Sequence, residues 1–466
     1  MEFKGYSFVA AANLFQNYGG LVIYVRYKKT KSSGISIKDV NKNHIWYDCP
    51  DREIVLVRNA FDEGSFYPNE SFDECIDLNT FRDEFGASVG IDYFMTNFSH
   101  SKSESINRDA LPESKKKVQI LSDSGGLQIA REVAGLIHPK DLVEFYNKNV
   151  DAGMILDIPL WVKDDKIAKR AAIIQKRNND VMLKYSRKGL ELINIFHGLS
   201  IEDRRKYRDI VEDKRIPRVA IGGLLVQKPL TGVNTIYEII EGSSFRYKQY
   251  HALGVFDMSY LALLVKIANS GDNPPHITSD STSHIQASLN NVYHIQMNEQ
   301  HIMSRQAYGT KAGSVSNPAL HLNCSCPVCA SIKYRDIFAF GHNRFNGFLA
   351  LHNAIQMARY TQSLQEACRH LTPAEFNKYV MVQLKNIKNK HDVKQALDYI
   401  DIVTQYGLKD AQKKYARHVG NWKHFEQAPK SLFDTTTTIE RYSHQELQQR
   451  TTRLLDQMEV QLKERS

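Results

Sequence analysis

Short apolar runs alternate with amphipathic stretches through the middle of the chain. The apolar runs, bounded by Gly, Pro, Ser or Asp as strands usually are, cover residues 118–121, 154–156, 192–196, 218–221, 250–253 and 276–278. Between them, apolar residues recur at helical spacing over residues 139–149, 164–188, 201–213 and 257–269. Strand followed by helix, repeated in this way, predicts an α/β fold with a parallel sheet.

A residue that could take part in catalysis or ligand binding follows nearly every predicted strand. These residues are Asp123, Asp157, His197, Gly222, Gly223 and Asp280. In a (β/α)8 barrel every strand ends on the same face, and active sites lie on that face. We therefore predict a TIM-like (β/α)8 barrel. Six of its units are visible in the pattern, and its first two strands are expected before Lys115.

Three aspartates on one face of a barrel suggest glycosyl chemistry. One carboxylate can attack an anomeric carbon to give a covalent sugar ester, while another handles the proton of the leaving group. An aspartate that follows a strand also often serves only as the N-cap of the next helix. The three aspartates together therefore favour catalysis more than any one of them does.

Length and charge indicate a large globular protein with an anionic partner. The 466 residues exceed one ordinary domain, which predicts a barrel-sized core with an appended region. The net charge of +9 and the pI near 9.0 favour nucleic acid as a partner, although such a charge can also serve solubility alone. We predict a barrel domain over residues 1–357 and a helical, basic region over residues 358–466.

Residues 378–423 of this basic region combine many lysines with aromatic residues. The aromatic residues are Tyr379, Tyr399, Tyr406, Tyr415 and Trp422. Cations can neutralise phosphates while aromatic rings stack on exposed bases, so the region is a candidate for nucleic-acid binding. A solvated helical face whose aromatic residues belong to the core would give the same composition. A further lysine run, at residues 115–117, is either a phosphate contact or a solvated strand edge.

Three cysteines and a histidine predict a closed zinc site. Cys324, Cys326 and Cys329 lie in one short loop, and His352 follows them. Thiolates at this spacing can converge on one ion, and a distant imidazole can complete a tetrahedron. Four protein ligands leave no open position, so we predict a structural zinc ion in a subdomain over about residues 315–357.

The remaining cysteines and the apolar segments predict a cytoplasmic protein. Cys49, Cys75 and Cys368 show no pairing pattern, which indicates a reducing compartment. Residues 7–15 lack a convincing cleavage site and are predicted to be a buried N-terminal element rather than a signal peptide. No run approaches the roughly 18 apolar residues of a membrane helix, so no membrane association is expected.

Four motifs, in this order, resemble those of the tRNA-guanine transglycosylase superfamily. The run Asp123-Ser124-Gly125-Gly126-Leu127-Gln128 is similar to the family signature Asp-Ser-Gly-Gly-Phe-Gln, and residues 219–224 are similar to the family's glycine motif. Asp280 stands where the family has its nucleophile, and the zinc cysteines with His352-Asn353 follow in the family's order. The likeness covers residues 115–357.

The resemblance implies a role for each matching residue. Asp280 would attack C1′ of a nucleotide and displace guanine, which leaves a covalent aspartyl-nucleotide intermediate, and Asp123 would be the general acid and base. Asp157 would accept hydrogen bonds from the purine's amino and ring N–H groups. His197-Gly198 stands where the tRNA enzymes carry Gln-Gly-Gly, although a lone histidine at a strand end is more often structural. The residues expected to contact the base are thus Asp157, Ser124, Gly125, Gly126, Gln128, His197, Gly198, Gly222, Gly223 and Leu224.

Departures from the family pattern indicate which branch of the superfamily the chain resembles. In the tRNA enzymes a Pro-Thr-Arg segment that contacts the tRNA follows the nucleophile, whereas Ser281-Thr282-Ser283-His284 follow Asp280 here. The chain is more similar to the 7-deazaguanine DNA transglycosylases called DpdA. Members of that branch exchange guanine in DNA for 7-cyano-7-deazaguanine, and in bacteria they work beside a companion ATPase.

Three functions remain open from the sequence. The first is a DNA-guanine transglycosylase, which must flip its guanine out of the duplex at a cost of a few kcal/mol. The second is a divergent tRNA-guanine transglycosylase of the queuosine or archaeosine type, which would share the base chemistry and differ in contacts to the 2′-OH or to tRNA shape. The third is a catalytically inactive nucleic-acid-binding subunit, against which the three aspartates argue.

Overall fold

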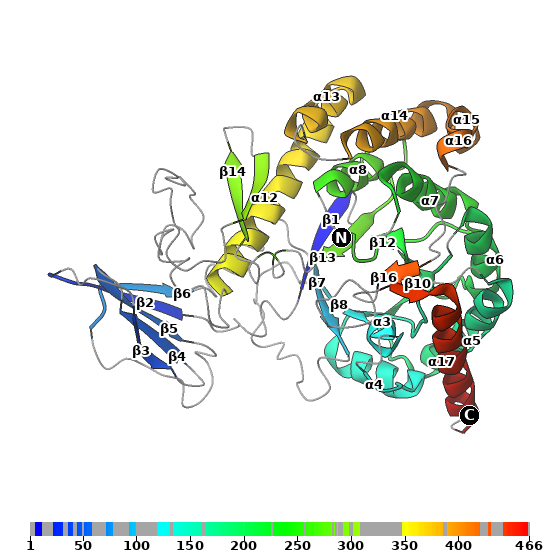
Figure 1. Cartoon of the computed structure of the whole chain (residues 1–466), viewed down its shortest axis with the longest axis horizontal. Helices are drawn as coiled ribbons and strands as arrows, with labels where there is room; N and C mark the ends of the chain where they lie inside the picture. Colours follow the sequence, from blue (N-terminus) through cyan, green and yellow to red (C-terminus); the bar gives the residue numbers. More distant parts are fainter. Residues whose placement is uncertain are drawn as a thin grey trace.

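A closed barrel of eight parallel strands forms the centre of the molecule (Figure 1). The computed structural model of the chain describes residues 5–11, 22–30, 36–40, 44–48, 51–57, 71–77, 93–98, 119–130, 134–160, 164–198, 200–224, 227–255, 258–281, 284, 287, 292–297, 302–307, 347–384, 389–419, 427–429 and 441–464. The barrel strands, in order around the barrel, are β1 (Tyr6–Ala11), β13 (Ile277–Ser281), β12 (Gln249–Ala252), β11 (Arg218–Ile221), β10 (Glu191–Phe196), β9 (Ala152–Met154), β8 (Gln119–Asp123) and β7 (Tyr93–Asn97).

The first barrel strand in the sequence closes the barrel. In β1, Val9 pairs with Asp280 of β13 on one side and with Tyr93 of β7 on the other. On the far side of β7, Asn97 pairs with Asp123 of β8. Because every pair is parallel, all eight carboxyl ends open on the same face of the barrel.

Helices that follow the strands cover the outside of the barrel. They are α3 (Gly126–Ala130), α4 (Pro139–Asn149), α5 (Asp165–Tyr185), α6 (Ile201–Val211), α7 (Pro229–Gly242), α8 (Met258–Ala268) and, after β13, α12 (Gly347–His370). Capping side chains at the N-terminus fix where some of these helices begin. The Asp164 side chain accepts the backbone N–H groups of Lys166 and Ile167, and Ser200 and Asp203 form a capping box before α6.

The barrel confirms the α/β fold predicted from the hydrophobic pattern. The predicted strand at residues 218–221 and the predicted helix at residues 139–149 agree with β11 and α4 at both ends. The other predicted strands and helices of the barrel overlap the observed ones with shifted ends. The two strands expected before Lys115 are β1 and β7. Of the N-terminal element predicted at residues 7–15, residues 7–11 lie in β1, where Ser7 and Val9 are buried, and residues 12–15 lie outside the described residues. Among the described helices, none is long and apolar enough to cross a membrane.

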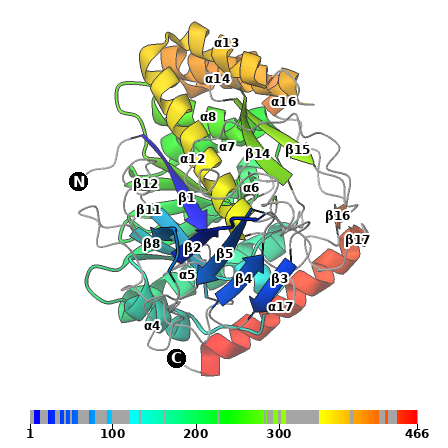
Figure 2. The same cartoon turned by 90° about the vertical axis from the view of Figure 1, so that its left-hand side faces the viewer.

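A five-stranded antiparallel sheet is inserted between β1 and β7. Its order is β3 (Ser36–Val40), β4 (His44–Asp48), β5 (Arg52–Val57), β2 (Val22–Tyr27) and β6 (Glu74–Asp77). Figure 1 shows the sheet projecting from one side of the barrel, and Figure 2 faces that side. Val55 is buried on one face of the sheet under Tyr24, Trp46 and Phe72, which gives the insertion a small apolar cluster of its own.

A hairpin and a layer of helices follow the last barrel strand. The hairpin is β14 (Val292–Met297) and β15 (Ile302–Ala307), and it packs on α12. The helices after α12 are α13 (Pro373–Gln383), α14 (Lys390–Tyr406), α15 (Leu408–Lys414) and α16 (Ala416–Val419). Helix α14 covers α7 and α8, where buried Lys266 of α8 forms an ion pair with Asp401 at 2.6 Å.

The last described helix, α17 (His444–Glu464), returns to the barrel after a short ribbon of β16 (Gln427–Pro429) and β17 (Arg441–Ser443). It packs on α5 and α3, and Figure 2 shows it as a long helix running obliquely along the molecule. Arg170 of α5 holds it, since Nε donates to Glu459 and a terminal nitrogen donates to Asp456, both at 2.7 Å. The carboxyl end of the chain is thereby fixed beside the barrel.

Apolar residues fill the middle of the barrel, and a polar network closes its amino end. The apolar residues are Val9, Tyr93, Leu121, Ala152, Met154, Ile193, Ile195 and Ala220. At the amino end, buried Arg218 donates to Oε1 of Gln249 at 2.7 Å and to Oε1 of Gln119 at 2.9 Å, and it forms an ion pair with Glu191. Each of these four residues is the first of its strand.

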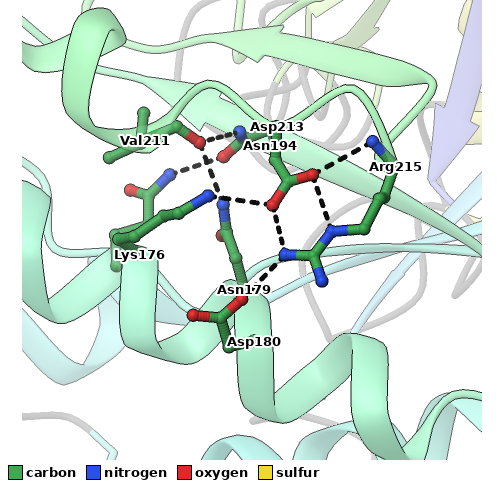
Figure 3. Close-up of polar contacts among 8 residues, drawn as sticks. Lys176, Asn179, Asp180, Asn194, Val211, Asp213 and Arg215 are labelled. Atoms are coloured by element: carbon green, nitrogen blue, oxygen red, sulfur yellow. Dashed lines mark hydrogen bonds and ion pairs between the residues drawn. The ribbon is translucent and has the colours of Figure 1, made fainter.

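A second charge cluster, around buried Asp213, joins α5 to the segment that enters β11 (Figure 3). The Asp213 carboxylate accepts from Lys176 at 2.9 Å and from Nε of Arg215 at 2.9 Å. Beside it, Asn179 and Asn194 donate to the carbonyl of Val211 at 3.0 and 2.7 Å. The Arg215 and Lys176 cations hold the pKa of the Asp213 carboxyl well below its usual range.

Candidate active site

The three predicted carboxylates lie at the carboxyl end of the barrel. Asp123 is the last residue of β8, Asp280 lies near the end of β13, and Asp157 follows β9 in an extended segment. Asp157 is buried, whereas the Asp280 side chain is 20 % exposed. The barrel thus brings together the three residues that the strand pattern singled out.

Asp123 is the carboxyl group with the most perturbed acidity. Burial and the charges of Asp157 and Asp280 raise its pKa to about 7, against the lowering effect of backbone N–H groups of Gly125 and Ser124. The charges of Asp157 and Asp280 thus act on Asp123 in addition to its burial. A carboxyl group that titrates near neutral pH can both give and take a proton, as general acid-base catalysis requires.

Asp157 is fixed by two side chains that sequence analysis placed beside it. Ser124 donates its hydroxyl proton to Oδ1 of Asp157 at 2.6 Å, and the same hydroxyl oxygen accepts the backbone N–H of Gly126 at 3.1 Å. Nε2 of His197 lies 2.8 Å from Oδ2 of Asp157. A carboxylate is acceptor-only, so His197 donates. Further lone pairs remain on both oxygens for a ligand, because an ionised carboxylate has about four acceptor positions.

Two of the predicted glycines allow these contacts. A Cβ on Gly126 would lie 2.4 Å from the backbone oxygen of Asp157, and a Cβ on Gly222 would lie 2.6 Å from Nδ1 of His197. Both separations are far shorter than van der Waals contact, so any larger residue would displace Asp157 or the His197 ring. The glycines after β8 and β11 therefore shape the site by leaving room for it.

The other predicted contact residues lie around this centre. Gln128 stands on α3 with its Oε1 buried and, within the described part of the chain, without a hydrogen-bond partner. Gly198 and Gly223 have positive φ values of 152° and 77° in the turns after β10 and β11. Leu224 is different, because its side chain is fully buried in the outer core and only its backbone could meet a ligand.

Two residues of the site were missed in the sequence. Nε2 of His251, on β12, lies 3.2 Å from Oδ1 of Asp280, and the backbone N–H of Gly254 donates to the same oxygen at 2.6 Å. On α6, buried Arg204 donates to the carbonyls of Gly198 at 2.7 Å and of Phe196 and Gly222 at 3.0 Å. It thus ties together the turns after β10 and β11, and its burial lowers its pKa to about 10.

The zinc prediction is only partly within the described residues. Cys324, Cys326 and Cys329 lie outside them, whereas His352 is fully buried on α12. Nε2 of His352 lies 2.7 Å from the carbonyl oxygen of His294. A carbonyl can only accept, so Nε2 carries the proton and the neutral ring has its lone pair on Nδ1. Histidines that bind metals are usually oriented by such a bond, so His352 fits the role of a zinc ligand. Elsewhere in the described residues no group of three or more metal-binding side chains occurs.

Asn353, next to His352, links α12 to the chain beyond Asp280. Its Oδ1 accepts the backbone N–H of His294 at 2.9 Å, and its Nδ2 donates to the carbonyl of His284 at 3.4 Å. His284 is itself fully buried, and burial lowers its pKa to about 4. His284, four residues after Asp280, therefore lies in the protein interior.

A groove of about 450 Å³ lies between α17 and the loops that follow β8 and β9. Its apolar lining includes Ile129 of α3 and Ile158, which directly follows Asp157. Helix α17 adds Arg450 and Arg453, and the described lining contains no acidic residue. The groove therefore offers an apolar surface and positive charge, and it adjoins the segment that carries Asp157.

The aromatic residues of the basic C-terminal region do not form one surface. Tyr399 is fully buried, and its hydroxyl donates to Oδ1 of Asn234 at 2.6 Å. Its ring packs edge-on against Tyr415 at 5.7 Å, while Tyr406 is exposed. Core packing thus explains Tyr399, whereas Trp422 and Lys115–Lys117 lie outside the described residues.

Neither a scan against protein-family models nor a search of curated proteins found a match for this chain.

Proposed function

We propose that the protein is a transglycosylase that exchanges guanine in DNA for a 7-deazaguanine base, 7-cyano-7-deazaguanine, through a covalent aspartyl-nucleotide intermediate. One observation supports it most. The carboxylates at three strand ends share one face of the barrel, and burial together with the charges of Asp157 and Asp280 raises the pKa of Asp123 to about 7. Base exchange requires a nucleophile and a group that gives and takes a proton at neutral pH. A carboxylate beside a carboxyl group of raised pKa can supply both.

Asp280 is the proposed nucleophile. Both of its hydrogen bonds fall on Oδ1, and Oδ2 has no hydrogen-bond partner in the part of the chain that the structure describes. In the first half-reaction Oδ2 bonds to C1′ as the bond from C1′ to N9 of guanine breaks. The bonding electrons go to N9, and protonated Asp123 supplies the proton that neutralises the departing base.

The second half-reaction reverses these steps with the new base. Ionised Asp123 takes the N9 proton of the incoming 7-deazaguanine, and N9 then bonds to C1′. The ester bond to Oδ2 breaks, and its electrons restore the Asp280 carboxylate. Asp123 ends protonated, ready for the next guanine, so no net proton is gained or lost in the exchange.

Asp157 is proposed to recognise the base in both half-reactions. Ser124 and His197 hold its carboxylate at 2.6 and 2.8 Å, so its direction is fixed before a base arrives. Such pre-organisation avoids an entropic cost on binding. The turn at Gly222 and Gly223, held by Arg204, would face the substituent on the deazapurine ring.

Two features favour nucleic acid as the substrate and DNA over tRNA. The net charge of +9 and the arginines of the groove beside α17 suit a polyanion. Ser281-Thr282-Ser283-His284 stand where the tRNA enzymes carry their tRNA-contacting Pro-Thr-Arg segment, and His284 is fully buried. A companion ATPase would supply energy to open the duplex. The zinc ion at Cys324, Cys326, Cys329 and His352 would stabilise the fold around α12.

The test measures incorporation of isotope-labelled 7-cyano-7-deazaguanine into duplex DNA and into unmodified tRNA in parallel. Purified wild type and Asp280→Asn are compared, with and without extract of the source cell. Label in DNA that requires Asp280 supports the proposal, and dependence on extract would indicate a required partner. Label in tRNA alone would establish the tRNA enzyme instead. Nucleic-acid binding without label in either substrate would indicate an inactive binding subunit.

A further inference from the structure

His251 lies in the barrel interior, directly beside the proposed nucleophile. It is only 1 % exposed, and in the register of β12 and β13 it pairs with Thr278. Nδ1 of His251 lies 2.8 Å from Oγ1 of Thr278, and Nε2 lies 3.2 Å from Oδ1 of Asp280. The imidazole therefore bridges a hydroxyl and the carboxylate, two positions apart on the same strand.

The donors and acceptors along this chain of contacts determine where the His251 proton lies. Arg218 can only donate, so the Gln249 atom that it contacts at 2.7 Å is the amide oxygen. The amide nitrogen of Gln249 then faces Thr278 and donates to Oγ1 at 3.3 Å. Thr278 can then donate its own proton to Nδ1 of His251, while the Asp280 carboxylate can only accept a proton from Nε2. A neutral ring that accepts at Nδ1 carries its proton on Nε2, where it points at Asp280.

We propose that His251 is a positioning residue for the nucleophile, set in one tautomer by the chain from Arg218 through Gln249 and Thr278. The proposal rests on the proposed base exchange. His251 and the N–H of Gly254 both donate to Oδ1, which fixes the plane of the carboxylate. Oδ2 is thereby left as the attacking atom, on a side chain that is 20 % exposed.

The same two donors act in both half-reactions. When Oδ2 bonds to C1′, Oδ1 becomes the carbonyl oxygen of the ester and keeps both hydrogen bonds. When the incoming N9 displaces the ester, the returning electron pair is shared with Oδ1, and the two N–H groups stabilise that charge. His251 makes no contact with the base in this scheme. Its loss should therefore lower kcat and leave the KM for the base nearly unchanged.

The kinetic test compares two pairs of variants in the full chain. We expect His251→Ala to lower kcat about 100-fold, as misplacement of a reacting group does. His251→Gln, which keeps an N–H donor, should recover part of the loss. Thr278→Val removes the hydroxyl at nearly constant shape and should lower kcat about 10-fold, whereas Thr278→Ser should restore it. Wild-type kcat in both His251→Ala and Thr278→Val would overturn the proposal.

A spectroscopic test reads the tautomer without any substrate. In protein labelled with 15N-histidine, the His251 signal, identified by its absence from His251→Gln, should show a proton on Nε2 alone. Thr278→Val should give a mixture of tautomers, and Thr278→Ser should not. A proton on Nδ1 in the wild type would contradict the inference. If the wild type exchanges no base, the proposed function fails, while the tautomer result still decides whether the chain from Arg218 operates.

Discussion

Nε2 of His197 lies 2.8 Å from Oδ2 of Asp157, and both side chains are buried at the carboxyl end of the barrel. On Asp280, at the other side of the same face, His251 has the equivalent position at 3.2 Å. Two of the three carboxylates thus have a histidine donor. Asp123 is instead held by backbone N–H groups, and its burial and the negative charges of the other two raise its pKa to about 7.

Gly222→Ala should disturb base binding through His197. The new methyl group would lie 2.6 Å from Nδ1 of His197, so the ring must move away from Asp157. We expect the KM for the labelled base to rise about 10-fold, as it should in His197→Ala, because one charge-assisted hydrogen bond is lost. The double variant should be little worse than either single variant, since the two changes remove the same contact. Asp272→Asn, at an exposed residue that precedes β13 and so lies toward the amino end of the barrel, is the control. Additive losses in the double variant would contradict this coupling.

Asp123 should set the pH dependence of both rate and stability. The exchange rate plotted against pH should change slope near pH 7, the pKa of Asp123. Asp123→Asn should abolish both the activity and this pH dependence. Because the folded-state pKa lies above the unfolded value near 3.8, its contribution to stability is full below pH 4 and is lost as pH rises to about 7. Asp123→Asn should therefore raise the free energy of unfolding at pH 8 by about 2–4 kcal/mol, with little change at pH 4. Denaturant unfolding at the two pH values measures the difference, and equal effects at both would count against the buried acid.

Zinc content and thermal stability should depend on the cysteine loop. We expect about one zinc ion per wild-type chain, and Cys326→Ser should lose both the metal and several degrees of melting temperature, because a structural metal contributes directly to folding. Cys368→Ser, at a half-buried free thiol of α12, should keep its zinc. Elemental analysis beside differential scanning fluorimetry makes the comparison. Full zinc occupancy in Cys326→Ser would refute the ligand set.

Asp213→Asn should destabilise the barrel without altering its chemistry. Lys176 and Arg215 would lose the carboxylate to which both donate, at a cost of about 1.5–3 kcal/mol. The folded-state pKa of Asp213 lies below the unfolded value, so its contribution is present above about pH 4 and is lost as pH falls further. Unfolding of the variant and wild type at pH 7 and pH 3 should converge at the lower pH. Exposed Asp272→Asn is the control, and a constant difference across pH would rule out this ion cluster as the cause.

Arg453→Gln should weaken nucleic-acid binding through the groove beside α17. Exposed Arg453 lines the groove close to the loops that follow Asp123 and Asp157. Losing one phosphate contact should reduce the slope of log affinity against log salt by about 1. Fluorescence anisotropy with labelled duplex DNA measures both quantities. Lys463→Gln, at the far end of the same helix, should behave as wild type, and equal losses in the two variants would point to net charge alone.

The fold could be predicted because each barrel unit repeats the same signal. Strands buried on both faces appear as short apolar runs, and the helices between them show one apolar face. The inserted sheet could not be placed in this way. Apolar and polar residues alternate along its strands, as they also would along irregular barrel strands. The inserted strands also separate β1 from β7 in the sequence.

The site was predictable where residues follow strands and not where they lie within elements. Asp123, Asp157 and His197 stand at strand ends, where parallel topology gathers them. His251 lies inside a predicted strand, and its only signal was a polar residue at an inward position of the barrel. Arg204 resembles any cation of an amphipathic helix, and only burial distinguishes it. Zinc ligation by the three cysteines remains a prediction.

The pairing of β1 with β13 has a consequence for synthesis of the chain. Residues 6–10 need residues 277–281 as partners, so the barrel cannot close until its last strand has left the ribosome. Contacts between residues far apart in the sequence slow folding. The sheet inserted after β1 increases the separation between β1 and β13 and so delays their pairing further. Until then the edges of β1 and β13 are open to other chains. Yield in recombinant expression should consequently improve with slower translation or added chaperones, and fragments that end before residue 277 should aggregate.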